Sequence, residues 1–325
     1  MVMPFDAVLL VAFGGPQGPD EVRPFLENVL RGRRVSPERI EEVAHHYERF
    51  GGVSPLTALT LAQARALEAA LRARDLPLPV HVGMRNWHPY LADTLAEMSR
   101  TGVRRAVGVL AAAQRSYSGC AQYRENVRDA RAALIASGAP PIDITYVGDW
   151  HQHPGFIEAN ADHVQRALER LPADRRTRAR LIFTAHSIPT SMAERYPYEA
   201  QLRASAERVA AAAGRPDWAL VYQSRSGRPG DPWLEPDVCE YLRREAAGGL
   251  DTVVLCPIGF LCDHVEVLYD LDVEAAQVCA EAGVAVARAE AVNTHPRFID
   301  ALADAVMDTC DRFENCTPLP LVSSA

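Results

Sequence analysis

Short runs of Val, Leu and Ile alternate along the chain with longer segments in which apolar residues recur every three or four positions. The short runs are apolar almost throughout, which is typical of strands buried on both faces. They predict strands at residues 7–12, 80–83, 106–110, 142–147, 181–184, 219–222, 252–256 and 284–287. The longer segments predict helices at residues 20–31, 37–49, 56–74, 90–101, 121–137, 155–170, 199–213, 236–247, 264–282 and 296–313.

Strands that alternate with helices form parallel sheets with right-handed crossover connections. Four of the predicted strands precede residue 150 and four follow it. We therefore expect an α/β fold of two doubly wound, Rossmann-like domains, residues 1–150 and 151–295, with a cleft between them. The closing helix at 296–313 can fold back on either domain, and we expect the Pro- and Ser-containing tail at 314–325 to be loose.

The composition argues against several functional classes. The 325 residues carry a formal net charge of −8 and no uninterrupted basic block, so nucleic acid is not an expected partner. The longest apolar run, residues 253–261, is about half as long as a membrane-spanning helix. The N-terminus lacks the basic segment of a secretory signal. We therefore expect a cytoplasmic protein.

Ligands of open parallel sheets bind beyond the carboxyl ends of the strands, so residues at these ends are the first candidates for a site. Phe13 follows the first predicted strand, and His186 follows the strand at 181–184. A histidine after a strand more often caps a helix or satisfies a buried polar group than binds a ligand. His186 becomes a functional candidate because an acidic cluster follows the neighbouring strand at 252–256.

That cluster consists of Glu266, Asp270 and Glu274, which recur every four residues and therefore line one face of the predicted helix at 264–282. A solvated acidic face is the simplest interpretation. The alternative is a row of oxygen ligands that leads a divalent cation toward His186. One imidazole and one carboxylate hold a first-row metal less firmly than thiolates do, which suits a site that passes its metal on.

Six motifs occur in order: LLVAFGGP (9–16), FGGVSPL (50–56), GMRNWHP (83–89), TAHSIP (184–189), DPWLEPDV (231–238) and PIGFLCDHVEVLYDLD (257–272). Together they resemble the ferrochelatase family, and the similarity extends from about residue 6 to residue 310. The resemblance implies an enzyme of haem biosynthesis that inserts Fe²⁺ into a porphyrin. Both of these substrates would meet in the cleft between two α/β domains.

The resemblance also implies roles for single residues. His186 would contact the pyrrole nitrogens or the incoming metal, and Glu266 would be its partner carboxylate across the pocket. Asp270 and Glu274 would form the outer part of the metal path. Phe13 stands where many relatives have tyrosine, so it would give the porphyrin a flat apolar wall without an oxygen ligand for the metal.

Four further residues match the regions that hold porphyrin propionates in bacterial ferrochelatases: Arg31, Arg33, Ser54 and Tyr123. Bacterial members act on coproporphyrin III, which has four propionates, or on protoporphyrin IX, which has two. Arg31, Arg33 and Tyr123 resemble the coproporphyrin type, so we expect that substrate. His46 stands near the place of an arginine in some such members, and protoporphyrin IX is therefore the alternative.

The resemblance implies no required cofactor, because iron is a substrate. Some members carry a [2Fe–2S] cluster held by four cysteines, for which Cys120, Cys310 and Cys316 are candidates here without an evident fourth ligand. An odd number of scattered cysteines is otherwise typical of reduced thiols. The family also leaves room for transient contacts with a membrane or with other proteins of the haem pathway.

Two other functions stay open. A chelatase for another metal or tetrapyrrole has a similar two-domain build, although such relatives generally lack the DH-x-E-x-LYD-x-D run of residues 263–272. A non-catalytic protein that binds haem or a metal would have a similar cleft. A metal-insertion assay separates the enzyme from the binding protein.

Overall fold

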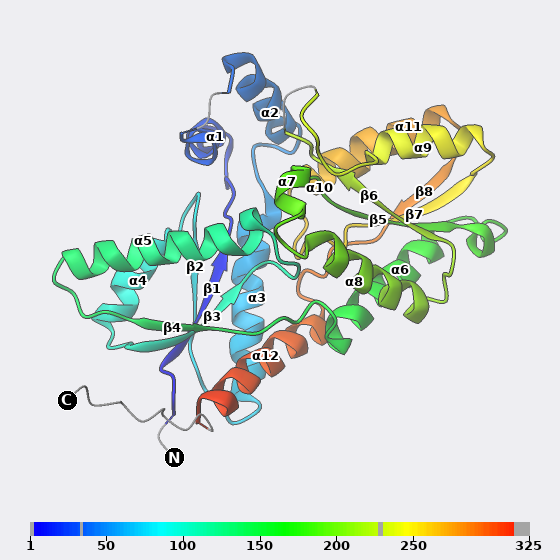
Figure 1. The fold of residues 1–325 in the computed structure, drawn as a ribbon. Helices are drawn as coiled ribbons and strands as arrows, with labels where there is room; N and C mark the ends of the chain where they lie inside the picture. The colour runs from blue at the N-terminus through cyan, green and yellow to red at the C-terminus, as the bar shows by residue number, and fades with distance from the viewer. Residues whose placement is uncertain (1–2, 33–34, 227–229, 315–325) are drawn as a thin grey trace.

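The computed structural model describes residues 3–32, 35–226 and 230–314. The described residues form eight strands in two parallel sheets, which confirms the predicted α/β fold (Figure 1). The first sheet contains β1 (Ala7–Ala12), β2 (Val80–Met84), β3 (Arg105–Leu110) and β4 (Asp143–Tyr146). The second contains β5 (Arg180–His186), β6 (Trp218–Gln223), β7 (Thr252–Cys256) and β8 (Ala285–Arg288). The domain division near residue 150 stays a prediction.

The two sheets have the same strand order, β2-β1-β3-β4 and β6-β5-β7-β8. In each sheet the chain leaves the first strand for a neighbour on one side and then crosses to the other side. The order therefore reverses between β1 and β3, and again between β5 and β7. Such switch points open a crevice at the carboxyl ends of the strands, where doubly wound proteins bind their ligands.

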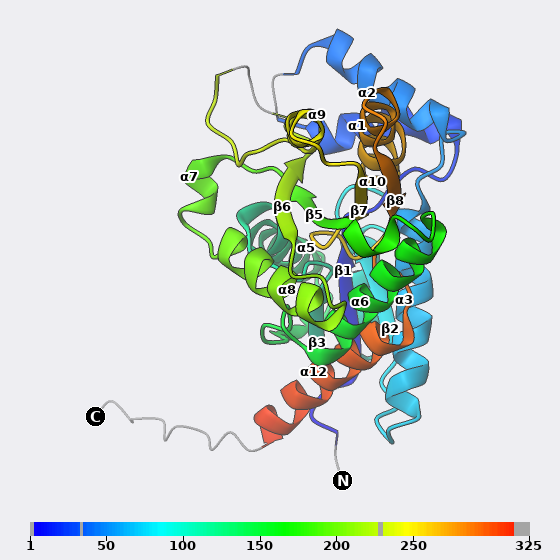
Figure 2. The same cartoon turned by 90° about the vertical axis from the view of Figure 1, so that its right-hand side faces the viewer.

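The described helices cover both sheets (Figures 1 and 2). Those that match predicted segments are α1 (Val22–Leu30), α2 (Pro37–Arg49), α3 (Pro55–Arg72), α4 (Leu91–Arg100), α5 (Gln122–Ala136), α6 (Pro154–Arg170), α8 (Tyr198–Ala212), α9 (Val238–Ala247), α10 (Val265–Tyr269), α11 (Ala276–Glu281) and α12 (Pro296–Glu314). The four-residue α7 (Thr190–Ala193) was not predicted, because it is too short to show a helical period.

The segment predicted as one helix at 264–282 is interrupted. Between α10 and α11 lies a π-helical turn, η4 (Asp270–Ala275). A second π-helical turn, η2 (Tyr117–Ala121), precedes α5. Short π-helical turns inside or beside α-helices are frequent at functional sites. Both turns follow the carboxyl end of a strand next to a switch point, β7 and β3 respectively.

One apolar cluster joins the two sheets. It contains Leu10 of β1 and Phe183 of β5, both almost completely buried, and Phe298 of α12. Strand β1 is buried along its whole length, as expected for a strand covered on both faces. The shared cluster fixes the two switch points relative to each other, because displacing one sheet would expose apolar surface.

The closing helix α12 packs against α3 and β3 as well as against α6, so it contacts both halves rather than one. Arg74, just after α3, reinforces this contact through ion pairs of 2.6 Å to Asp300 and Asp304. The predicted loose tail lies outside the described residues from residue 315 onward.

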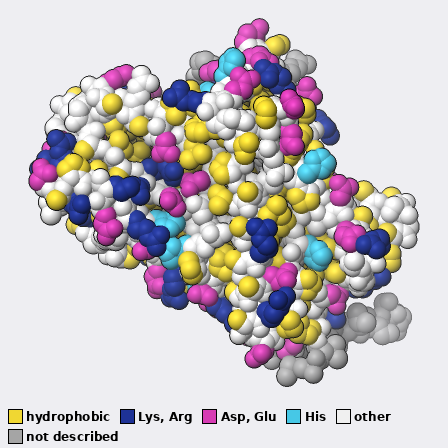
Figure 3. All heavy atoms as spheres, turned by 180° about the vertical axis from the view of Figure 1, so that it is seen from behind, with side chains coloured by type: hydrophobic (Ala, Val, Ile, Leu, Met, Phe, Trp, Pro, Cys, Tyr) yellow, Lys and Arg dark blue, Asp and Glu magenta, His cyan; other side chains and the backbone are white. Residues whose placement is uncertain are grey.

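The surface carries both signs of charge. Figure 3 shows Arg side chains interspersed with Asp and Glu on the face opposite to that of Figure 1, without a continuous block of either sign. Among the described residues, no helix combines the length and the apolarity that crossing a membrane requires.

Candidate active site

His186 is the last residue of β5, at the second switch point. Its ring nitrogen Nδ1 forms a hydrogen bond with the carbonyl oxygen of Ser187. A carbonyl only accepts, so in this arrangement Nδ1 carries the proton and Nε2 keeps its lone pair. The hydroxyl of Tyr198 donates to the carbonyl oxygen of His186 at 3.1 Å and helps to hold the strand end. The free Nε2 can therefore accept a proton or bind a metal.

Glu266 lies in the first turn of α10, after the loop that follows β7. Its side chain is exposed and has no ion pair among the described residues. His264, the N-cap of α10, lies within electrostatic reach of both predicted central residues. Burial lowers the pKa of His264; Glu266 opposes this shift and His186 adds to it. The fold thus places His186 and Glu266 within electrostatic reach of one imidazole, that of His264, to which the sequence had given no role.

Asp270 opens the π-helical turn η4 and is held by two donors. Its Oδ2 accepts hydrogen bonds from the hydroxyl of Ser224 and from Nε2 of Gln223, the latter at 3.1 Å. Burial, together with the nearby charges of Glu266 and Glu274, raises the pKa of Asp270 to about 7. Near neutral pH this carboxyl can therefore take up or release a proton.

Ser224 has a left-handed backbone, with φ of 58°. This conformation is uncommon for a residue other than glycine and costs about 1–3 kcal/mol. The conformation accompanies the hydrogen bond from the Ser224 hydroxyl to Asp270. Sequence reasoning missed Ser224, although its place directly after β6 was a usable signal.

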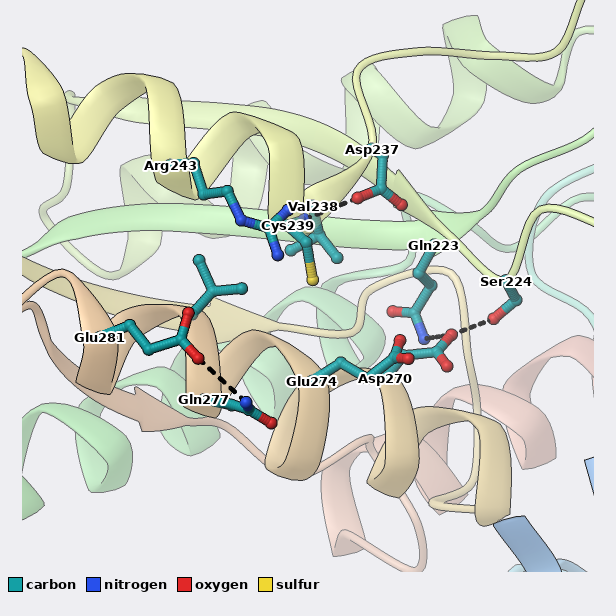
Figure 4. Close-up of a pocket in the computed structure, with 11 residues that line it drawn as sticks. Gln223, Ser224, Asp237, Val238, Cys239, Arg243, Asp270, Glu274, Gln277 and Glu281 are labelled. Carbon is teal, nitrogen blue, oxygen red and sulfur yellow. Dashed lines mark hydrogen bonds between the residues drawn. The ribbon is translucent and has the colours of Figure 1, made fainter. Parts of the chain in front are cut away.

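The acidic row continues into a cavity of about 290 Å³ between α9 and the η4–α11 segment (Figure 4). Asp270 and Glu274 line it on one side, with Asp237 and Arg243 on the other. Burial raises the pKa of Glu274, and the nearby Asp237 adds to this shift. Asp237 also caps α9, since its Oδ1 accepts from the backbone N–H of Cys239 at 2.8 Å. Asp237 belongs to the DPWLEPDV motif but had not been selected as a candidate.

The loop and turn that carry Glu266 and Asp270 are tied to the end of β8 by Arg288. Its Nη1 lies 2.7 Å from Oδ1 of Asp263, and its Nε lies 2.7 Å from Oδ1 of Asp272. One guanidinium thus links the residue before His264 to the middle of η4. The side-chain amide of Asn293 donates to Oδ2 of Asp263 at 2.8 Å and completes the network.

Phe13 follows β1, at the first switch point. Its carbonyl oxygen accepts from the N–H of Asn86 at 3.0 Å, and its half-buried ring lies 6.3 Å from that of Phe25 in an edge-on arrangement. The guanidinium of Arg85 lies 5.7 Å from the centre of the Phe13 ring. The position fits a flat wall of the cleft.

The other residues predicted to contact the porphyrin differ in how exposed they are. Arg31 is exposed at the C-terminus of α1 and donates to Oδ1 of Asn28 at 2.5 Å. Ser54 is only 3% exposed, and its hydroxyl caps α3. The Tyr123 ring is 6% exposed within the core beneath α5, and burial raises its pKa to about 12. Arg33 lies outside the described residues. Among the described members of this set, Arg31 is the one that is exposed to solvent.

The two cysteine candidates in the described part of the chain, Cys120 and Cys310, pack in different apolar clusters. Cys310 is buried on α12 in the cluster that joins the sheets, where burial raises the pKa of its thiol to about 11. Cys120 lies in η2, packs against a different cluster and donates to the carbonyl oxygen of Ser116. Cys316 lies outside the described residues. No group of three metal-ligating side chains in the described ranges includes a cysteine.

One other group in the described part of the chain has ligand atoms within 4.8 Å of one another: Asp162, His163 and His295. Nδ1 of His295 accepts the N–H of Arg297 at 3.2 Å, so the proton is on Nε2, which lies 3.0 Å from Oδ2 of Asp162. His295 therefore caps α12 and pairs with an aspartate. Its hydrogen bonds occupy both ring nitrogens, which leaves this group poorly suited to a metal.

A comparison with protein families shows the family of the chain. The ferrochelatase family matches residues 5–310. The chain belongs to the ferrochelatase family. It is 48% identical to the ferrochelatase of Rhodopirellula baltica over 94% of this chain and 86% of that one. It is 47% identical to the coproporphyrin III ferrochelatase of Mycolicibacterium vanbaalenii, with 94% and 90% covered. The coproporphyrin III ferrochelatase of Streptomyces coelicolor is 46% identical, with 98% and 89% covered.

Solved chelatase structures share the fold of this ferrochelatase. SirB from Bacillus subtilis with Fe³⁺ superposes with a TM-score of 0.57 at 11% identity and covers 95% of this chain and 96% of its own. The sirohydrochlorin chelatase SirB from Bacillus subtilis subspecies spizizenii in complex with cobalt gives 0.51 at 14% identity, with the same coverage. The chain is thus a ferrochelatase, an enzyme that inserts metal into a porphyrin, on a chelatase fold.

Proposed function

We propose that this ferrochelatase inserts Fe²⁺ into coproporphyrin III, with His186 and Glu266 as the central residues. The observation that carries the proposal is the position of His264, which is within electrostatic reach of both His186 and Glu266. The names of several relatives support the porphyrin, since those from Mycolicibacterium vanbaalenii and Streptomyces coelicolor are coproporphyrin III ferrochelatases.

The reaction releases two pyrrole protons for each metal that enters, so the site must accept protons as well as deliver a cation. Nε2 of His186 has a free lone pair and accepts the first proton. Glu266 has no ion pair among the described residues and offers its carboxylate to the metal or to the second proton. Asp270, with a pKa of about 7, carries protons away from Glu266.

Fe²⁺ reaches Glu266 along the row formed by Asp270 and Glu274. These carboxylates are hard oxygen ligands at the inner side of the cavity between α9 and η4. Burial raises the pKa of each. A cation that binds there relieves the repulsion between neighbouring carboxylates. The row holds the metal by charge and lets it leave toward the porphyrin nitrogens.

The porphyrin lies between the two halves, with residues 1–150 as its binding side and residues 151–295 as the side that carries out the chemistry. Phe13 supplies the flat wall, and Arg31 supplies a fork-shaped donor for a propionate. The imidazole of His46 on α2 stacks on the ring of Tyr269 on α10, with centroids 3.5 Å apart and planes 12° apart. Through this stack, α2 packs against α10, the helix that carries Glu266.

The test is a comparison of initial rates under anaerobic conditions with Fe²⁺ and either coproporphyrin III or protoporphyrin IX, followed by porphyrin fluorescence. We expect the higher kcat/KM with coproporphyrin III. Faster turnover of protoporphyrin IX would overturn the substrate assignment, and binding of either porphyrin without metal insertion would favour the non-catalytic alternative.

A further inference from the structure

A second cavity, of about 350 Å³, opens at the carboxyl ends of β3 and β4. It is bounded by the start of α5 on one side and by residues 195–197, between α7 and α8, on the other. None of its lining residues belongs to the row from His186 to Glu274 or to the cavity beside α9. Strand ends next to a switch point are where doubly wound sheets bind ligands, so this cavity has the right position for a site of its own.

The charge around this cavity is positive. Three arginines line it, Arg115, Arg124 and Arg195, against one carboxylate, Asp149. Arg115 forms an ion pair of 2.6 Å with Asp149, which leaves two cationic side chains. Arg124 lies over the ring of Tyr146 at 4.6 Å, a contact that orients the guanidinium without neutralising it. Such a rim repels a divalent metal ion and attracts an anion.

One of the lining residues, Gln114, has a buried donor without a hydrogen-bond partner among the described residues. Gln114 is only 4% exposed, and this donor is the Nε2 atom of its side-chain amide. Leaving a buried amide donor unpaired is unfavourable, and such groups usually meet a ligand or a water molecule. Arginine forks and an amide N–H together match an oxyanion, whose oxygens accept several hydrogen bonds at once.

We propose that this cavity binds a small oxyanion, a phosphate or a carboxylate, through Gln114, Arg124 and Arg195. The anion is either free in solution or a propionate of the bound porphyrin, since both present the same oxygens. The proposal does not depend on the roles given to His186 and Glu266. Gln114, Arg124 and Arg195 have no part in the metal insertion proposed above.

The test is isothermal titration calorimetry of inorganic phosphate into the full-length protein at constant ionic strength. We expect a dissociation constant of about 1 mM or lower. Gln114→Leu and Arg124→Gln should each weaken binding about five- to tenfold. Arg128→Gln, one turn along α5 and outside the cavity, should leave it unchanged, because this side chain is 72% exposed and pairs with Asp129.

A repeat of the titration with coproporphyrin III bound separates the two sources of the anion. Unchanged phosphate binding shows a site for a free anion, and loss of phosphate binding shows that a propionate occupies the cavity. Gln114→Leu should keep or raise the melting temperature, because it removes an unpaired buried donor. Absence of phosphate binding up to about 10 mM, or equal weakening by Arg128→Gln, would overturn the proposal.

Discussion

Arg288 and Asp263 form an ion pair of 2.7 Å between side chains that are only 14% and 12% exposed. Asp263 precedes His264 and Glu266 in the chain, so the pair fixes the start of the segment that is proposed to handle the metal. The same guanidinium binds Asp272 within the π-helical turn and fixes the middle of that segment as well. We therefore expect Arg288 to act as a positioning residue for this segment.

Arg288→Gln should lower kcat and raise the KM for the metal about tenfold or more, while porphyrin affinity stays the same. The buried carboxylate of Asp263 would lose its cationic partner, and stability should fall by about 3–5 kcal/mol. Metal-dependent kinetics well below the melting temperature measure the first effect. Arg297→Gln is the control, because Arg297 makes an exposed ion pair with Glu158 that is worth about 0–1 kcal/mol. Normal kinetics in a destabilised Arg288 variant would show a purely structural role.

His186→Ala should lower the rate of insertion of both Fe²⁺ and Zn²⁺ by far more than tenfold, because it removes the lone pair of Nε2 that accepts the pyrrole proton. Porphyrin binding and folding should persist, as fluorescence quenching and circular dichroism would show. His45→Ala, on the exposed face of α2, serves as the control. A loss within tenfold, or about 1.4 kcal/mol in the barrier, would remove His186 from the central role.

Glu266→Gln should reduce turnover strongly, because the shape of the side chain is kept and its charge is lost. Asp270→Asn and Glu274→Gln should mainly raise the KM for the metal. These two residues stand farther along the row, in the cavity beside α9. Steady-state kinetics with varied metal concentration distinguish the two patterns. Three variants with identical behaviour would contradict a graded path.

Asp270 should make stability depend on pH. Its pKa is about 7 in the folded protein and 3.8 when unperturbed, so the folded state binds more protons between about pH 4 and pH 7. Stability falls as the pH rises through this window and stays reduced above it. Asp270→Asn should therefore raise the unfolding free energy at pH 8 by about 1–3 kcal/mol and leave it unchanged below pH 4. Denaturant titrations at both pH values check this, with the exposed Asp129→Asn as the control.

Arg31→Ala should raise the KM for coproporphyrin III about five- to thirtyfold and that for protoporphyrin IX less, because coproporphyrin brings two more carboxylates to the mouth of the cleft. Added salt should weaken coproporphyrin binding more, since the pairing is electrostatic. Arg49→Ala, at the end of α2, offers a comparison of equal charge. Equal losses for both porphyrins would contradict this role of Arg31.

The strands and most helices could be predicted because buried parallel strands and amphipathic helices leave periodic patterns in the sequence. The π-helical turn η4 could not, because a single widened turn leaves the spacing of the apolar residues Val267 and Leu271 compatible with an ordinary helix. Its first residue, the half-buried Asp270, accepts hydrogen bonds from Ser224 and Gln223, 46 and 47 residues away in the chain, and such distant partners leave no local pattern.

The sequence predicts candidate residues where these follow strands or belong to a motif, as His186 and Glu266 do, and their roles stay predictions. Their partners were not, because contacts made by tertiary packing have no local signature. Arg288 ends β8 and reads as an ordinary charged residue at a strand end. Ser54 is the opposite case. It belongs to a recognisable motif and was predicted to contact a propionate, but in the structure it is buried and its hydroxyl caps α3.

Because the two sheets share one strand order, β1 and β5 are equivalent strands, and Phe13 and His186 stand at equivalent places just beyond or at their ends. In the roles proposed above, Phe13 would give one half of this repeated strand plan an inert aromatic face, and His186 would give the other half a reactive imidazole. Substitutions in the first half would then change which macrocycle is accepted without disturbing proton and metal transfer in the second. Under that proposal, the selection of the porphyrin and the chemistry of insertion can diverge separately.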